Sequence, residues 1–237
     1  MFCLSFILNR INPKAIILYI TTLVFLFFAI FLTNTRAIWI ALLFSLLVFF
    51  VKKPRIIIVS SVLIGLFMFL FSDIILSRFL TIKYFGSDLS SLGRLQAWIA
   101  TTALLKNNLL TGYWFDAFMD LRDNVYTIYL VPVIHSHNTY LRSLLEMGLI
   151  GSVLYYSFFF RALYFSIKLR NSENSNTVNG LLDGIQLSII SLLIVFIFEP
   201  YLSLFGCSTI IIWLIISFTF KLKYYINAER ELNNISC

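Results

Sequence analysis

The composition of this chain is that of a protein whose solvent is a lipid bilayer. It has 237 residues, of which 60% are hydrophobic and only 12% charged, whereas soluble domains carry about 25% charged residues. Twenty-five phenylalanines and a mean hydropathy of +0.91 exceed what a soluble fold of this size can bury. The net charge of +7 does not indicate nucleic-acid binding, because the basic residues punctuate apolar runs and form no single basic stripe.

Six apolar runs are candidate membrane spans. They comprise residues 15–33, 37–51, 56–72, 141–165, 184–198 and 200–220. A helix that crosses a bilayer needs about 20 residues, so the second and fifth runs must recruit flanking residues. The predicted fold class is therefore an all-α polytopic membrane protein with about six transmembrane helices and one long outer loop.

The basic residues predict how these spans are oriented. With the N-terminus inside, eleven of the 18 Lys and Arg residues lie in inner segments, including Lys52, Lys53 and Arg55 in one short turn. Because short loops rich in Lys and Arg stay in the cytoplasm, both termini are expected to be cytoplasmic. The predicted order is three spans in 1–72, an outer loop with the candidate site in 73–140, three spans in 141–220 and a cytoplasmic tail in 221–237.

The outer loop is the one long polar stretch of the chain, and loops of this length without a function are uncommon. Residues 92–106 within it predict an amphipathic helix, which Ser90 or Ser91 can cap. Its apolar face, at helical spacing, consists of Leu95, Trp98, Ile99 and Leu105. That face could lie on the membrane surface or pack on the bundle of spans.

The two histidines of the chain, His135 and His137, lie where the outer loop enters the fourth span. A histidine there can titrate near neutral pH and act as a general base. Two other interpretations remain open from the spacing: interfacial polar residues that bond to backbone or water, and a metal site. The metal site ranks lowest, because no Cys or close carboxylate completes the ligand set.

Arginines near the outer ends of the spans are candidates for binding an anion. Arg36 lies in a tight turn between two apolar runs, where it either snorkels to the interface or needs a partner. Arg94 precedes Trp98 by four residues, a spacing at which the guanidinium can stack on the indole, and a solvated surface arginine is the alternative. Guanidinium groups match phosphate well through planar bidentate bonds.

Acidic residues offer partners for such arginines. Arg142 and Glu146 are four residues apart on the fourth span, so they can neutralise one another. Glu199 lies in the last predicted outer turn, where it is either the partner of an arginine or an interfacial residue.

Three motifs, which contain Arg36, Gly93-Arg94 and His137-Asn138, together resemble those of the O-antigen ligase/polymerase family of membrane glycosyltransferases. The first is the turn Thr33-Asn34-Thr35-Arg36. The second is Gly93-Arg94 with Trp98, followed by Gly112. The third is His137-Asn138-Thr139-Tyr140-Leu141, followed by Glu146-x-Gly148-x-x-Gly151. The resemblance extends over residues 20–165 and implies part of a GT-C-type fold, with the loop 73–140 in the periplasm.

The chain departs from the family pattern in two respects. Leu109 and Trp114 stand where members usually have a Pro and a second Gly around Gly112. Members also have further spans before the matching region, so the chain is expected to correspond to their C-terminal half. A missing N-terminal half or a partner subunit is part of that expectation.

The resemblance implies a metal-independent glycosyltransferase of the bacterial inner membrane that requires no cofactor. Such an enzyme moves a glycan from an undecaprenyl-diphosphate carrier to lipid A-core or to a growing polysaccharide on the periplasmic face. By resemblance, His137 orients or deprotonates the acceptor hydroxyl, and Arg36 and Arg94 hold the diphosphate. The supporting residues that it implies are His135, Asn138, Tyr140, Trp98 and Glu146.

Other functions remain as alternatives. A polymerase of the same family shares these motifs. A transporter or flippase-like protein, or a non-catalytic subunit, would bind or move a lipid-linked glycan without reacting it. Dependence on His137 separates these classes, because a general base is indispensable whereas a structural histidine tolerates Asn or Gln.

Overall fold

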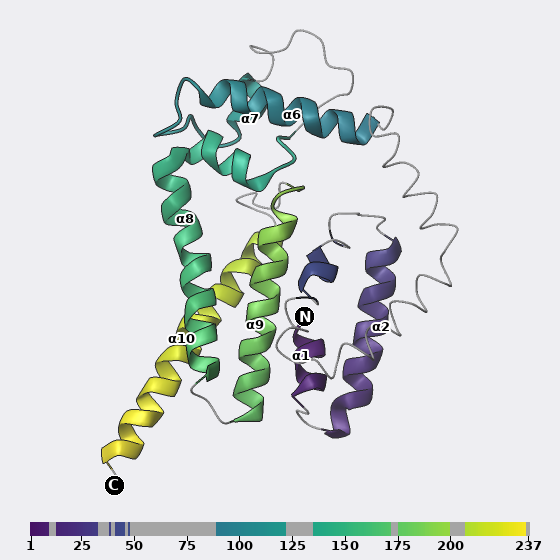
Figure 1. The fold of residues 1–237 in the computed structure, drawn as a ribbon, viewed down its shortest axis with the longest axis vertical. Helices are drawn as coiled ribbons and strands as arrows, with labels where there is room; N and C mark the ends of the chain where they lie inside the picture. Colours follow the sequence, from purple (N-terminus) through teal and green to yellow (C-terminus); the bar gives the residue numbers. More distant parts are fainter. Residues whose placement is uncertain are drawn as a thin grey trace. The chain divides into compact units, whose positions relative to one another are not determined.

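The computed structural model describes residues 1–9, 13–32, 38, 41–45, 47, 89–121, 135–171, 175–199 and 207–235. Within these ranges the regular elements are helices, and none is a strand (Figure 1). Arg36 and the predicted span 56–72 lie outside the described residues, as does most of the span 37–51.

Two compact units divide the chain. Unit 1 contains Met1–Ser45, Val153–Phe196 and Tyr201–Cys237, and unit 2 contains Leu46–Ser152 and Ile197–Pro200. Arg94, His137 and Glu199 all fall in unit 2, so the geometry of the candidate site can be read within one unit.

Three of the described helices are long and apolar enough to cross a membrane: α8 (Thr139–Asn171), α9 (Asn176–Val195) and α10 (Cys207–Ile235). They correspond to the predicted spans 141–165, 184–198 and 200–220. The first predicted span is α2 (Ile16–Leu32), which is apolar but shorter. Their exposed side chains include many large apolar ones, as expected for helices that face lipid. The described part is thus that of an all-helical membrane protein.

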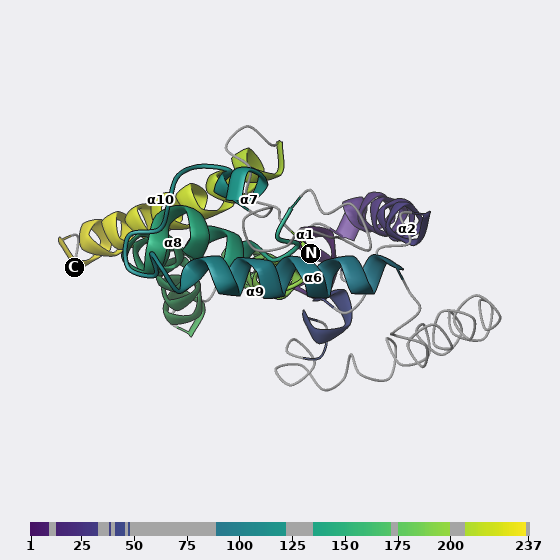
Figure 2. The ribbon, with the colours of Figure 1, turned by 90° about the horizontal axis from the view of Figure 1, so that it is seen from above.

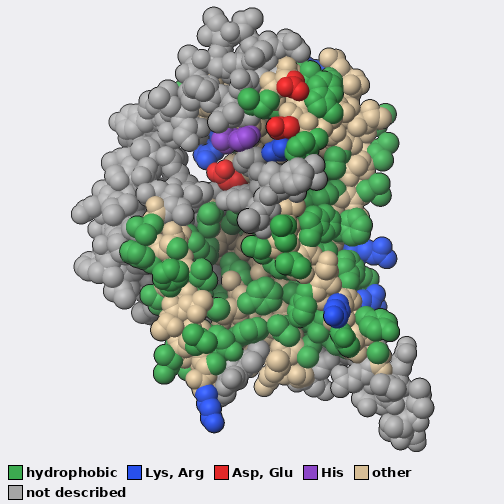
Figure 3. Space-filling model, turned by 180° about the vertical axis from the view of Figure 1, so that it is seen from behind, with side chains coloured by type: hydrophobic (Ala, Val, Ile, Leu, Met, Phe, Trp, Pro, Cys, Tyr) green, Lys and Arg blue, Asp and Glu red, His purple; other side chains and the backbone are tan. Residues whose placement is uncertain are grey.

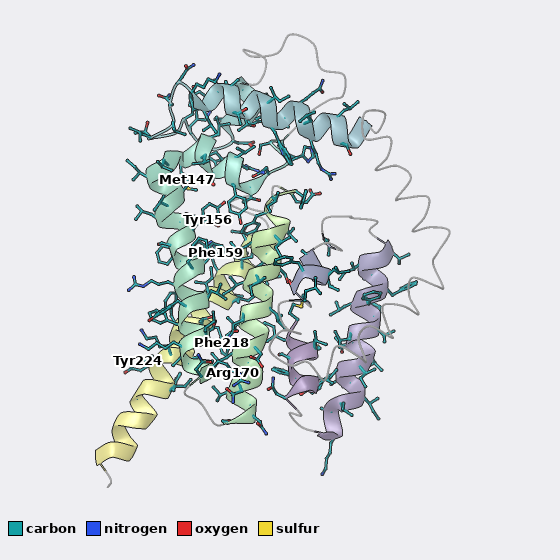
Figure 4. The ribbon with its side chains drawn as sticks, in the orientation of Figure 1. Met147, Tyr156, Phe159, Arg170, Phe218 and Tyr224 are labelled. Atoms are coloured by element: carbon teal, nitrogen blue, oxygen red, sulfur yellow. The ribbon has the colours of Figure 1, made fainter. Side chains whose placement is uncertain are left out.

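Aromatic rings join α8 and α10 within unit 1. The ring centroid of Trp213 on α10 lies 5.5 Å from that of Tyr155 and 6.2 Å from that of Phe159, both on α8. Further along the same helices, the rings of Phe165 and Phe220 lie 5.9 Å apart. Because both sets of contacts advance in the same direction, α8 and α10 run parallel (Figure 4). Edge-to-face ring pairs at these distances stabilise the packing beyond the burial of area.

A short helix at the N-terminus, α1 (Phe2–Leu8), is one that the hydropathy pattern does not predict. It packs on α9, where Ser5 Oγ donates to the carbonyl oxygen of Gly180 at 2.7 Å. A Cβ added to Gly184 would meet the ring of Phe2 at 2.5 Å. Seven residues are too few for an autonomous helix, so this contact with α9 is what holds α1 in place.

The buried carboxylate of Asp183 joins three elements of unit 1. It accepts hydrogen bonds from Arg170 Nε at 3.1 Å and from Asn9 Nδ2 at 3.0 Å. Its side chain is only 4% exposed, and a buried charge is costly unless it is paired. Asp183 can therefore lie inside α9, which begins at Asn176 after the N-cap Ser175 and before the predicted start of the span at residue 184.

Unit 2 is built around α6 (Leu89–Leu105), α7 (Ala117–Leu121) and the first turns of α8. The helix predicted at 92–106 is confirmed as α6, which is straight (Figure 2). The core consists of Ala97, Ala100, Leu104, Leu105, Phe118 and Leu145. Of the predicted apolar face, Leu105 is buried, whereas Leu95 and Ile99 are exposed. Small alanines take the buried face instead, since they let neighbouring helices approach closely.

Two glycines allow the loop after α6 to cross α8 at close range. Gly112 and Gly148 have φ angles of +71° and +68°, a region that side-chain-bearing residues rarely adopt. A Cβ on Gly148 would overlap the carbonyl oxygen of Leu110, and a Cβ on Gly112 would overlap the backbone nitrogen of Gly148. Gly148 also departs from helical geometry, so α8 bends there, beside the labelled Met147 in Figure 4.

Candidate active site

Asn138 fixes the start of α8. Its Oδ1 accepts a hydrogen bond from the Leu141 N–H at 2.9 Å, and its carbonyl oxygen accepts one from the Arg142 N–H, also at 2.9 Å. Ser136 Oγ donates to the same carbonyl oxygen at 3.1 Å. This is the pattern of a helix N-cap, which satisfies backbone donors that the first turn leaves free. Asn138 therefore sets where α8 begins, directly after His137.

His137 is held in an unusual backbone conformation between the loop and α8. Its φ angle is +47°, in the left-handed region where residues other than glycine are uncommon. Its carbonyl oxygen accepts a hydrogen bond from Trp98 Nε1 at 3.3 Å, so α6 helps to position it. Residues held in such conformations cluster at functional sites.

The surroundings of the His137 imidazole favour its neutral form. Partial burial lowers its pKa below the usual 6.5, and the positive charges of Arg94 and then of His135 lower the pKa further. Its Nδ1 is buried and has no hydrogen-bond partner among the described residues. A neutral imidazole with an unused nitrogen can accept a proton from a hydroxyl group. His135 is exposed, with its ring centroid 6.3 Å from that of His137.

Arg94 forms an ion pair with Glu199, at 3.0 Å between Nη2 and Oε1. The sequence offered Glu199 as the partner of an arginine, and this pairing confirms it. The backbone oxygen of Glu199 in turn accepts a hydrogen bond from Thr139 Oγ1 at 2.5 Å. Glu199 thus contacts both Arg94 and the first residue of α8. Arg94 Nε is buried and lacks a hydrogen-bond partner among the described residues, which leaves that donor for an anion.

Trp98 and Arg94 are directed to partners other than each other. The indole N–H of Trp98 is bonded to the His137 carbonyl oxygen, and the guanidinium of Arg94 is bonded to Glu199. The spacing of four residues suggested that the two side chains stack. In the structure the same spacing places them on one side of α6, where each reaches a different part of the site.

The predicted pair of Arg142 and Glu146 is confirmed, at 2.7 Å between Arg142 Nε and Glu146 Oε1. Asp116, which the sequence did not single out, completes the group: its carboxylate lies 3.2 Å from Arg142 Nη2. The Asp116 N–H also donates to Glu146 at 3.1 Å. Only 9% of the Arg142 side chain is exposed. The role of Glu146 is therefore to hold the loop before α7 against α8, next to the two glycines.

The structure gives fewer contacts for the remaining predicted site residues. Tyr140 lies in the first turn of α8, half-buried, and its carbonyl oxygen accepts a hydrogen bond from Ser143 Oγ at 2.9 Å. Arg36 lies outside the described residues. Across the part of the chain that the structure describes, no three His, Cys, Asp or Glu side chains come together as metal ligands would. Figure 3 shows the histidines (purple) beside basic (blue) and acidic (red) side chains on one face.

The family model described as O-antigen ligase matches residues 21–156, more than half of the chain. The chain belongs to the O-antigen ligase family. Arg94, His137, Gly112 and Gly148 fall inside the matched range, whereas Glu199 lies beyond it. No match was found among the curated proteins or among the solved structures. Membership of the O-antigen ligase family points to ligase- or polymerase-type transfer of glycans at a membrane.

Proposed function

We propose that this O-antigen ligase family member transfers a glycan from an undecaprenyl-diphosphate carrier to lipid A-core, on the periplasmic face of the bacterial inner membrane. The observation that supports this most directly is the His137 imidazole, which has no Nδ1 partner among the described residues, whose surroundings favour the neutral form, and which lies close enough to Arg94 for their charges to interact. Glycan transfer needs a base for the acceptor hydroxyl and a cation for the leaving diphosphate. These two side chains are suited to the two tasks.

In the proposed reaction, the acceptor hydroxyl donates a hydrogen bond to His137. As the acceptor oxygen attacks the anomeric carbon, its proton passes to the imidazole. The bond between that carbon and the diphosphate oxygen breaks, and its electron pair stays with the diphosphate. Attack from the opposite side inverts the anomeric centre. The proton then leaves His137 to solvent or to the departing diphosphate.

Arg94 stabilises the negative charge that grows on the diphosphate, and Arg36 is its proposed second ligand. The Nε of Arg94, which has no hydrogen-bond partner among the described residues, offers a donor to a phosphate oxygen. An arginine suits this task because its planar fork forms two parallel bonds to one phosphate. In this proposal the two guanidinium groups take the place of a metal ion.

The proposal is tested with purified protein reconstituted in lipid, given an undecaprenyl-diphosphate-linked glycan and lipid A-core. Wild-type protein is expected to form glycosylated lipid A-core, and His137→Gln is expected to lose at least about a hundredfold in rate, the usual contribution of a general base. His135→Gln is the matched control, because it changes the exposed histidine two residues away. It is expected to keep most of the activity.

Three results would contradict the proposal in distinguishable ways. Undiminished glycan transfer by His137→Gln would exclude His137 as the general base. Extension of the donor glycan with no product on lipid A-core would favour a polymerase. Movement of the lipid-linked glycan across the membrane, without any new glycosidic bond, would favour a transporter.

A further inference from the structure

An apolar patch lies exposed at the crossing of the loop after α6 with α8. It consists of Leu109, Leu110, Trp114, Leu149 and Ile150, which are between 43% and 61% exposed. The two halves of the patch are far apart in sequence and are joined by hydrogen bonds. Contiguous exposed patches of large apolar side chains usually mark a surface that something covers.

Part of the backbone of the patch is paired across the crossing, although the loop has no regular structure. The N–H groups of Leu149 and Ile150 donate to the carbonyl oxygens of Leu109 and Leu110, at 2.8 and 3.3 Å. The N–H of Tyr113 donates to the carbonyl oxygen of Leu145 at 2.8 Å. A loop in water does not need such partners. Irregular backbone in contact with hydrocarbon does, because no water is present to satisfy it.

The edge of the patch is polar in the manner of a membrane interface. The indole N–H of Trp114 donates to Asp120 Oδ2 at 3.2 Å, while the ring itself is half-exposed beside the leucines. Next to it, Phe115 is exposed, and its ring centroid lies 5.7 Å from the Arg142 guanidinium carbon. Tryptophans take this position at bilayer surfaces, with the ring among the lipids and the N–H toward water.

We propose that the apolar patch inserts into one leaflet of the bilayer, so that lipid acyl chains cover it. The course of α8 favours lipid over a protein partner. From Ile150 the helix continues as a candidate membrane span, and Val153 and Leu154, three and four residues on, are about 60% and 62% exposed on the same face. The lipid that covers this face of the span therefore reaches the patch. The loop after α6 is then a lipid-embedded support for the site, in addition to the spans.

Fluorescence quenching tests this insertion. The protein is reconstituted in phosphatidylglycerol vesicles whose acyl chains carry bromine near the headgroup end. The signal of Trp114 is the difference between wild type and Trp114→Phe, a change that keeps an aromatic ring at an exposed position. We expect Trp114 to lose the larger part of its fluorescence to bromine and to resist quenching by iodide in the aqueous phase.

The matched control introduces a tryptophan elsewhere in the same unit. Thr102→Trp, made in the Trp114→Phe background, places the probe at an exposed polar position of α6. Bromine is expected to quench it less than Trp114. Equal quenching at the two positions would overturn the proposal. So would quenching of Trp114 by iodide and not by bromine, which would show a patch open to water and suited to stacking on sugar rings.

Discussion

Glu199 occupies one edge of the Arg94 guanidinium, which is the group proposed to hold the diphosphate. A carboxylate there competes with an incoming phosphate for the same donors. We expect Glu199→Gln to tighten the binding of undecaprenyl diphosphate, because it removes the competing charge and leaves the backbone bond to Thr139 in place. The gain should be several-fold, since a partly exposed ion pair is worth about 1 kcal/mol or less. Binding is measured by calorimetry in detergent.

Asp120→Asn is the control for that measurement, because it removes an exposed acidic charge whose hydrogen-bond partner is Trp114 and not Arg94. Its affinity for undecaprenyl diphosphate should match that of wild type. Weaker binding by Glu199→Gln would mean that the carboxylate aims the guanidinium and does not compete for it.

The protonation of His137 determines how activity depends on pH. The imidazole accepts a proton only while it is neutral, so the rate falls as pH drops through its pKa. Because burial, Arg94 and His135 all lower that pKa below 6.5, the acid limb of kcat/KM should lie below pH 6.5. His135→Gln removes one positive neighbour and should move the limb to higher pH. Initial rates between about pH 5 and 8 measure the acid limb of wild type and that of His135→Gln. A limb that His135→Gln leaves in place would contradict this account.

At the scale of elements, the crossing of the loop with α8 depends on two glycines. Gly148→Ala should lower the free energy of unfolding by about 2–5 kcal/mol, because it adds both backbone strain and overlap with Leu110. Gly148→Asn should cost as much, because φ 68° with ψ −174° is a conformation that glycine alone adopts readily and the overlap is the same. Ala103→Gly in α6 is the reference, with a cost of about 1 kcal/mol. Thermal unfolding in detergent compares the stability of the three variants. Equal losses of stability would exclude the close approach of the loop after α6 to α8.

Two variants distinguish the role of Asn138 as the N-cap of α8 from a direct contact of Asn138 with substrate. Asn138→Ala should cost about 1 kcal/mol of stability because the Leu141 N–H loses its acceptor. Asn138→Ser restores an acceptor at the cap and should recover most of that stability. If Asn138→Ser also recovers glycan transfer, the residue acts through the helix. Recovery of stability without recovery of transfer would instead assign Asn138 a direct role toward substrate.

At the scale of the whole molecule, the apolar runs of α8, α9 and α10 were predictable because hydropathy is a local property. The burial of Asp183 inside α9 was not, since its partner Asn9 comes from a distant segment. Helix α1 was missed because seven residues give too short a pattern. The proximity of Arg94 to His137 came from the family resemblance, because nothing local relates two residues so far apart in sequence. The number of spans, their orientation and the role of Arg36 stay predictions.

One of the contacts between the end of α1 and α9 involves the buried charge of Asp183. Arg170→Gln should lower stability by about 1–3 kcal/mol, because Asp183 keeps Asn9 but loses its main counter-charge. The double variant Arg170→Gln/Asp183→Asn should regain part of that loss, since no buried charge is then left unpaired. Unfolding of both variants and of Asp183→Asn completes a double-mutant cycle. Strictly additive effects would show that the two residues do not interact.

The bend of α8 at Gly148 sets the first turns of the helix apart from the apolar span that continues beyond it. A straight helix would raise His137 above Leu149 by about 1.5 Å for each of the intervening residues, nearly twenty ångströms in all. A diphosphate tethered to a polyprenyl tail cannot follow it to that height without drawing hydrocarbon into water. The bend separates the turns before Gly148 from the helix that follows it, and in the proposed function the reach of the tether limits which sugars can react. The sugar bonded to the diphosphate then lies beside His137, and the sugars further along the glycan extend away from His137.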